Sequence, residues 1–396
     1  MPQLFALLVG ILFVFSPQAE EHREVAAPTL EEAQELIVTV QDIVEYYYVD
    51  QVDRRAMIEG ALKGLFESLD PHSTYLTPQT LELLREANDG HYYGYGIEVS
   101  IDEGVVQVIT PLAHSSAHYA GIKPGDILVR VDDLPATPDT MDKLIQYIKT
   151  ASREDRTLTL TLKREKAPMP LTVSLQPSNI TIDSTQFRSL PHQVGYLKIN
   201  SFNRQTTDEV ARFSSRIRQE GLTQLILDLR NNPGGMFDSA VQIADMFLDA
   251  GLIVSTHGRF LDANNDYYAS DAAPLGQLEV VVLINEGSAS AAEILAGALK
   301  DHQKATLFGQ TSFGKGTVQS LIPLLGQQGA IKLTTARYAT PNGTFIDKKG
   351  IDPDIQVLLE NSVEKPIMAE SEMNGQWLQD SQLAAAYEWL LQPSRE

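Results

Sequence analysis

Between residues 194 and 300 the hydrophobic pattern changes repeatedly between two kinds of segment. Short continuous apolar runs predict buried strands, and segments with apolar residues every three or four positions predict helices. The predicted strands are residues 194–199, 224–229 and 280–284, and the predicted helices are residues 207–220, 239–248 and 291–300. Because strands and helices alternate, we expect an α/β core whose sheet is largely parallel.

Two turns follow predicted strands of this core. Residues 230–235 (RNNPGG) follow the second strand, and residues 285–291 (NEGSASA) follow the third. In parallel sheets, binding sites form beyond the carboxyl ends of the strands. We therefore expect both turns to open on the same side of the sheet.

The pattern upstream of residue 194 differs from that of the core. Apolar residues at helical spacing over residues 30–65 predict two helices, which could pack on the main body or form a dimer contact. A short helix is expected at residues 81–89. Short strands at residues 95–101, 105–109, 127–131 and 158–162, with one helix at residues 140–150, predict a compact β-rich domain.

The predicted fold class is therefore α/β and multidomain, and 396 residues are ample for two or three domains. We place a helical N-terminal region at 25–83, the β-rich domain at 84–168, the α/β core at 169–359, and a tail with a final helix at 360–396. Residues 167–170 (APMP) are the expected exit linker of the β-rich domain.

The first nineteen residues predict an exported protein. Residues 4–15 form an apolar run too short to span a bilayer comfortably, and a small residue, Ala19, precedes an acidic pair. A cleaved signal peptide and an uncleaved N-terminal anchor both fit this pattern. In either case we expect the rest of the chain outside the cytoplasm.

Composition narrows the classes of function. The formal net charge of -21 argues against a nucleic-acid partner, which requires Lys and Arg to neutralise phosphates. The chain has no cysteine, which excludes disulfides, thiolate metal sites and a cysteine nucleophile. No metal-ligand spacing is present, and we expect no metal and no cofactor.

Ser290 is the first candidate for chemistry, and two interpretations compete. The segment 290–293 (SAAE) is a capping box, and a helix cap needs no further purpose. A serine at a helix N-terminus is also well placed to act as a nucleophile. Local sequence alone favours the cap.

A serine nucleophile needs a base and an oxyanion site. Lys315 lies between two glycines, and a lysine can act as a base if its pKa is lowered toward neutrality. Gly234 and Gly235 could supply backbone N–H groups for an oxyanion. The alternatives are a solvated loop lysine and a simple tight turn.

These segments resemble the carboxyl-terminal processing peptidases, also called tail-specific proteases. The resemblance rests on residues 285–294 (NEGSASAAEI), 296–301 (AGALKD) and 313–319 (FGKGTVQ). Further marks are residues 69–73 (LDPHS), with His72 where the family often has an aromatic residue, 92–97 (YYGYGI), 125–126 (GD) and 228–235 (DLRNNPGG). The tail after Glu360 falls outside the resemblance.

The resemblance implies a serine endopeptidase with a Ser-Lys dyad. Ser290 would be the nucleophile and Lys315 the base, while Gln319, expected one helical turn later, would orient the lysine. The oxyanion hole would combine the N–H of Ala291 with that of Gly234 or Gly235, a choice that the sequence leaves open. Ser288 would be a turn residue.

The resemblance also identifies the β-rich domain as a PDZ domain and the α/β core as the protease core. Its loop Gly94, Tyr95, Gly96 and Ile97 would receive a terminal carboxylate, and the peptide would add as a strand beside the helix at 140–150. The implied substrates are exported or misfolded polypeptides with free C-termini.

Two other functions stay open at this point. The first is a catalytically silent peptide-binding adaptor or chaperone of the same fold, and the second is hydrolysis of a non-peptide ester or amide. The expected location is the bacterial periplasm, with or without a membrane anchor. An adaptor protein and a homo-oligomer formed through the N-terminal helices are further expected partners.

Overall fold

The computed structural model describes residues 28–102, 104–112, 115–123, 125–164, 167–181, 184–358 and 380–392. The expected signal peptide or anchor, and the part of the acidic tail at residues 359–379, lie outside the described residues. The chain divides into two compact units, residues 1–61 and 62–396. Among the described residues, we find no helix with the length and apolar character needed to cross a membrane.

The first unit contains the helix α1 (Leu30–Tyr47) and the first part of α2 (Arg54–Glu67). Thr29 and Glu32 form a complete capping box at the start of α1. None of the residues of α1 is buried, and large apolar side chains such as Leu36 and Ile43 are more than half exposed. The two predicted helices are confirmed.

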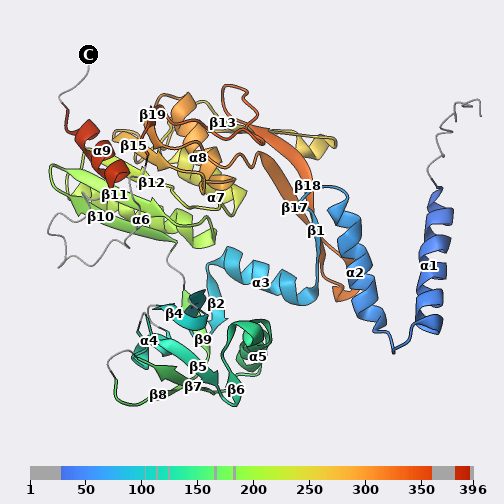
Figure 1. Ribbon diagram of the computed structural model, residues 1–396. Helices are drawn as coiled ribbons and strands as arrows, with labels where there is room; N and C mark the ends of the chain where they lie inside the picture. Colours follow the sequence, from blue (N-terminus) through green and yellow to red (C-terminus); the bar gives the residue numbers. More distant parts are fainter. Residues whose placement is uncertain are drawn as a thin grey trace, which may run out of the picture. The chain divides into compact units, whose positions relative to one another are not determined.

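The α/β core is built on a six-stranded sheet with the order β10-β11-β12-β15-β16-β19 (Figure 1). Its strands are β10 (Thr185–Leu190), β11 (Val194–Ile199), β12 (Gln224–Asp228), β15 (Glu279–Ile284), β16 (Ala305–Gly309) and β19 (Ile355–Gln356). Only the β10–β11 pair is antiparallel. The largely parallel sheet predicted from the alternating pattern is therefore confirmed.

Helices cover both faces of this sheet because successive strand residues point to opposite sides. Leu227 and Val282 pack into a cluster with α6 (Arg204–Gln219), α7 (Phe237–Asp245) and α8 (Ala291–Asp301). Ile226 and Val281 pack on the other face against the final helix, α9 (Ser381–Leu390), drawn in red in Figure 1. The final helix thus belongs to the α/β core and not to a separate tail.

A second, antiparallel sheet was not predicted. Its order is β1-β18-β13-β14, with β17 also paired to β18. Its strands are β1 (Thr74–Leu76), β13 (Leu252–Gly258), β14 (Asn265–Tyr268), β17 (Thr317–Pro323) and β18 (Ala330–Ala339). This sheet joins a segment near residue 74 to one near residue 332, a pairing that local patterns cannot reveal.

The β-rich domain has a sheet with the order β3-β4-β5-β7-β8, to which β6 pairs at β5. The elements are β3 (Ile97–Asp102), β4 (Val105–Pro111), α4 (Ser116–Tyr119), β5 (Ile127–Val131), β6 (Leu134–Pro135), α5 (Met141–Arg153), β7 (Leu158–Lys163) and β8 (Leu171–Leu175). The expectation of an exit linker at residues 167–170 is wrong, because β8 pairs with β7 beyond it and Leu175 belongs to the domain core. The chain leaves through β9 (Ser178–Thr181), which pairs with β2 (His91–Gly94). Before β2 lies α3 (Pro78–Asp89).

Candidate active site

Ser290 lies where the turn after β15 meets the first residue of α8. Its backbone has φ 56° and ψ -115°, whereas a helix cap normally has an extended conformation. A non-glycine residue held at positive φ is strained, and such strain persists only where surrounding contacts impose it. An ordinary cap does not require this geometry, so the local preference for a cap does not account for Ser290.

The carboxylate of Glu293 connects the segments of Ser290 and Lys315. Its Oε2 atom accepts the N–H of Ser290 at 2.8 Å and the N–H of Lys315 at 2.9 Å. Its Oε1 atom accepts the Ser312 hydroxyl at 2.5 Å and the Gly314 N–H at 2.7 Å. Glu293 is 1% exposed, so four charge-assisted contacts are made in a water-poor environment.

Tyr338 joins the same two segments from β18. Its hydroxyl lies 3.1 Å from the carbonyl oxygen of Ser290 and 3.0 Å from that of Lys315. Burial, with the charges of Glu293 and Asp347, raises the pKa of Tyr338 well above its usual value, so the hydroxyl remains a donor. The structure thus fixes the backbones of Ser290 and Lys315 to two common side chains.

The surroundings of Lys315 favour its neutral form. Burial lowers the pKa of its ammonium group, and the positive charge of Lys332 acts in the same direction. The negative charge of Glu293 opposes them, but the net shift is downward. A lysine with a lowered pKa is deprotonated at lower pH than a free lysine, as a general base requires.

The two turns predicted to open on one side of the sheet do meet. A Cβ atom on Gly234, which has φ 97°, would lie 2.8 Å from the Cβ of Ser290 and 3.0 Å from the Ala291 nitrogen. A Cβ on Gly235, which has φ 139°, would lie 2.0 Å from the carbonyl oxygen of Phe202. Glycine is therefore required at both positions, because the backbone has positive φ and neighbouring atoms leave no space for a Cβ.

The N–H groups at this turn differ in their partners. The N–H of Gly234 donates to the Asn232 side chain at 2.8 Å. Within the described part of the chain, the N–H groups of Gly235 and Ala291 have no hydrogen-bond partner. The first N–H groups of a helix are unpaired by its geometry, which leaves that of Ala291 free for an anion.

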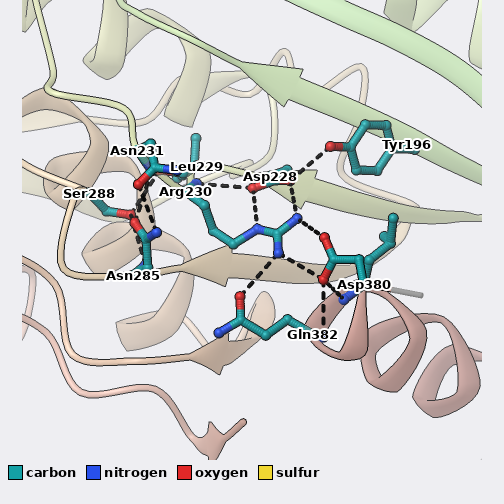
Figure 2. A network of polar contacts seen from close by, with 10 residues as sticks. Tyr196, Asp228, Leu229, Arg230, Asn231, Asn285, Ser288, Asp380 and Gln382 are labelled. Carbon is teal, nitrogen blue, oxygen red and sulfur yellow. Dashed lines mark hydrogen bonds and ion pairs between the residues drawn. The ribbon is translucent and has the colours of Figure 1, made fainter. Parts of the chain in front are cut away.

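Polar side chains lock the two turns together (Figure 2). The Ser288 hydroxyl donates to the carbonyl of Leu229 at 2.8 Å and accepts the Asn285 N–H at 3.0 Å. The Asn285 amide oxygen accepts the N–H of Asn231 at 2.8 Å. Ser288 is fully buried, in keeping with a turn residue.

Gln319 does not lie one helical turn after Lys315, and that expectation is wrong. Residues 317–323 form strand β17, in which Gln319 pairs with Thr334 of β18. The Gln319 amide donates to the Thr317 hydroxyl at 2.8 Å. Strand β17 forms because β18 supplies its backbone partners, which a motif of seven residues cannot show.

The 69–73 segment is anchored on β18, the strand that also pairs with β17. Asp70 accepts the N–H groups of His72 and Ser73, each at 2.8 Å, and the Thr334 hydroxyl at 3.2 Å. Burial, with the nearby charge of Lys315, lowers the pKa of His72. The sequence motif therefore brings His72 into the electrostatic environment of Lys315.

The four PDZ-loop residues all line a groove of about 360 Å³ in the β-rich domain. Its other walls include α5 and strand β3. Strand β3 lies at the end of its sheet: it pairs with β4 on one side, and no strand among the described residues pairs with its other side. The carbonyls of Tyr95 and Gly96 accept hydrogen bonds from the residues around Ser115, whereas their N–H groups have no partner within the described residues. Burial raises the pKa of Tyr95 to about 12, and its hydroxyl donates to the Arg156 carbonyl at 2.6 Å.

The segments joined by Glu293 in the α/β core and the groove in the β-rich domain agree with the family comparisons, which place the chain in the class of peptidases with a PDZ domain. Residues 193–357 match the model of peptidase family S41, residues 107–164 that of a PDZ domain, and residues 15–80 that of the activating protease CtpB N-terminal domain. The chain belongs to family S41, and the resemblance to the carboxyl-terminal processing peptidases is confirmed.

Named relatives support this membership. The chain is 38% identical to a carboxy-terminal-processing protease of Bartonella bacilliformis over 79% of this chain and 72% of the relative. It is 31% identical to the carboxy-terminal processing protease CtpB of Bacillus subtilis over 86% of this chain and 69% of the relative. A Bacteroides fragilis structure described as a candidate S41 protease shares the fold, with a TM-score of 0.55, 16% identity and coverage of 89% and 96% of the two chains.

Proposed function

We propose that the protein is a serine endopeptidase that uses Ser290 as its nucleophile and Lys315 as its base. The observation that carries this proposal is the single buried Glu293 carboxylate that binds the N–H groups of both residues. The strained backbone of Ser290 and the lowered pKa of Lys315 support it. A structural cap would need neither the strain nor the lysine segment.

The reaction proceeds through an acyl-enzyme. Neutral Lys315 takes the proton of the Ser290 hydroxyl as its oxygen attacks the substrate carbonyl carbon. The C–N bond then breaks, and Lys315 returns the proton to the leaving amine. In the second half, Lys315 takes a proton from water, whose oxygen attacks the ester, and Ser290 regains its proton.

The oxyanion is assigned to the N–H groups of Ala291 and Gly235. Gly235 is preferred over Gly234 because the Gly234 N–H already donates to Asn232. Each such donor is typically worth about 3 kcal/mol of transition-state stabilisation. Gln319 keeps the role of orienting Lys315 only as the resemblance implies it, and its amide donates to the Thr317 hydroxyl.

The PDZ groove is assigned to the C-terminal end of the substrate. The N–H groups of Tyr95 and Gly96, which have no partner among the described residues, are suited to a terminal carboxylate. The lining carries two basic side chains on α5, Lys149 and Arg153, and two acidic ones on α3, Glu82 and Glu86. The edge of β3 can pair with an extended peptide, and apolar lining residues such as Leu144 and Ile148 favour an apolar last residue. The substrates are thus loosely folded proteins with free, apolar C-termini.

The test uses an unfolded protein with an apolar C-terminus as substrate for wild type, Ser290→Ala and Lys315→Ala. Both variants should lose cleavage by at least about 10³-fold while still binding the C-terminal peptide. Equal cleavage by all three would refute the dyad. If wild type also binds without cleaving, the adaptor or chaperone function applies instead. Amidating the substrate C-terminus should raise KM, and an unchanged KM would refute the PDZ assignment.

Location and assembly are further proposals. The apolar run at residues 4–15 supports export to the periplasm, with or without anchoring. The exposed apolar side chains of α1, such as Leu36 and Ile43, support a homo-oligomer through the N-terminal helices. The homo-oligomer is tested by measuring the mass in solution of wild type and of the double variant Leu36→Glu/Ile43→Glu by sedimentation. If the double variant has the same mass in solution as wild type, the proposal is refuted.

A further inference from the structure

A buried guanidinium group lies directly before the proposed oxyanion turn. Arg230 is 5% exposed, and all its N–H directions are used (Figure 2). Its Nε and Nη2 atoms donate to the two carboxylate oxygens of Asp228 at 3.0 and 2.7 Å. Its Nη1 atom donates to Asp380 and to Gln382, each at 3.0 Å, and its Nη2 atom lies 2.8 Å from Asp380.

Two of these three partners come from the final helix. Asp380 is the N-cap of α9, and its Oδ1 atom accepts the N–H groups of Gln382 and Leu383 at 3.1 and 3.0 Å. Gln382 is fully buried and donates its amide to the carbonyl of Val357 at 2.8 Å. Both residues lie outside the segment 193–357 that matches the S41 family.

The contacts of Arg230 continue into the turn. The Arg230 N–H donates to Asp228 at 3.0 Å, and the next residue, Asn231, is held by Asn285 of the turn before Ser290. Four residues after Arg230, Gly234 approaches Ser290 so closely that no Cβ would fit. A displacement at Arg230 would therefore be transmitted to the N–H groups that face the reacting carbonyl.

The charged form of Arg230 is stabilised by its two carboxylate partners. Burial opposes the charge of Arg230, but Asp228 and Asp380 raise its pKa and keep it charged. Burial alone would raise the pKa of Asp228, and the charge and hydrogen bonds of Arg230 outweigh that effect and lower it. A buried guanidinium that loses an acceptor must move or admit water, because an unpaired buried charge is costly.

We propose that Asp380 and Gln382 are positioning residues for the reaction, through which the C-terminal helix α9 holds the oxyanion turn in its catalytic geometry. The inference rests on the proposed function. The competing interpretation is that α9 only covers the apolar face of the sheet through residues such as Leu390 and Tyr387.

The test compares full-length Asp380→Asn with Leu390→Ala. Asparagine is as good an N-cap as aspartate, so Asp380→Asn preserves the helix start while removing the charge and one acceptor from Arg230. Leu390, the last residue of α9, is 2% exposed and packs in the apolar cluster between the helix and the sheet. It is not among the polar partners of Arg230, so its truncation should lower stability alone. The readouts are the melting temperature, kcat and KM, and the affinity for a peptide aldehyde, whose hemiacetal oxygen occupies the oxyanion position.

For Asp380→Asn we expect kcat to fall about tenfold with KM within about twofold, as for a partial loss of an oxyanion contact. Aldehyde affinity should fall by the same factor. Leu390→Ala should lower the melting temperature by a similar amount to Asp380→Asn and keep the wild-type kcat. A wild-type kcat in Asp380→Asn, or an equal loss of kcat in Leu390→Ala, would overturn the proposal.

A second variant covers the case in which Asp380→Asn does not fold. Gln382→Met keeps the side-chain volume and removes one acceptor from Arg230, so it should lower kcat in the same way. A folded Gln382→Met with wild-type kcat would then overturn the proposal. Ser290→Ala in the same assay separates the proposed function from the positioning role of α9, because full activity of this variant would refute the proposed function itself.

Discussion

Replacing Glu293 with glutamine tests how the two halves of the proposed dyad are held together. The carboxylate accepts four hydrogen bonds, from Ser290, Lys315, Ser312 and Gly314. Glutamine has one acceptor oxygen, and its amide would face N–H groups at the other position. The Ser312 hydroxyl can rotate and accept from that amide, whereas a backbone N–H cannot adapt.

One or two buried donors therefore lose their acceptor in Glu293→Gln. At about 1–3 kcal/mol for each, the free energy of unfolding should fall by about 1–6 kcal/mol. If about 3 kcal/mol of this loss also appears in the transition state, kcat falls about 10²-fold. We expect a loss of that order because the segments of both Ser290 and Lys315 lose their common anchor.

The pH profile provides a second, independent readout of the same substitution. The charge of Glu293 raises the pKa of Lys315, so its removal lowers that pKa. Activity rises with pH as Lys315 becomes neutral. The rising limb of kcat should thus move to lower pH in Glu293→Gln, although its plateau is lower.

The assay measures kcat against pH on a peptide substrate, alongside urea unfolding. The matched control is Glu209→Gln, because Glu209 is also buried and accepts the hydroxyls of Ser184 and Thr185 at 2.9 and 2.6 Å. Neither partner belongs to the segments of Ser290 or Lys315. The control should lose stability and keep kcat. If Glu293→Gln keeps kcat within about twofold of Glu209→Gln, with an unshifted profile, the shared-carboxylate argument is refuted.

Three further predictions address the charge, the groove and the turn. Lys332→Gln removes a charge that lowers the pKa of Lys315, so the rising limb of kcat should move to higher pH, and an unmoved limb would contradict this. Gly96→Ala should raise KM for substrates with free C-termini at least about tenfold and leave KM for short amidated peptides unchanged. The reason is that Gly96 has φ 75° and an added Cβ would lie 2.0 Å from the Cβ of Ser115. A peptide titration that gives wild-type affinity would refute this prediction. Ser288→Ala should lower the free energy of unfolding by about 1–3 kcal/mol yet leave measurable cleavage, and complete inactivity of the folded variant would question the assignment of Ser290.

Local patterns were sufficient for three of the six strands of the core sheet and for the helices that follow them, but not for β10, β16 and β19. The alternation of apolar runs and helical spacing predicted the parallel strands β11, β12 and β15, because each is buried on both faces and followed by a helix. The second sheet was missed, since β1 and β18 pair across more than 250 residues. The helical position expected for Gln319 failed for the same reason: its conformation is set by a distant strand partner.

The candidate site was predictable in its parts and not in its connections. The motif predicted Ser290 and Lys315, and the capping box correctly indicated that Glu293 reaches the Ser290 N–H. No local signal shows that the same carboxylate also binds residues 314 and 315, or that Tyr338 joins both segments. Long-range polar contacts depend on the packed fold, whereas caps depend on neighbours in sequence.

The central claim is that Ser290 forms the covalent bond to the substrate. A single turnover with a peptide substrate, quenched in acid and followed by digestion and mass spectrometry, tests it most directly. We predict an acyl group on the peptide that contains Ser290, localised by fragmentation to that residue, with no adduct in Ser290→Ala. An adduct on Ser288, or undiminished turnover by Ser290→Ala, would contradict the account.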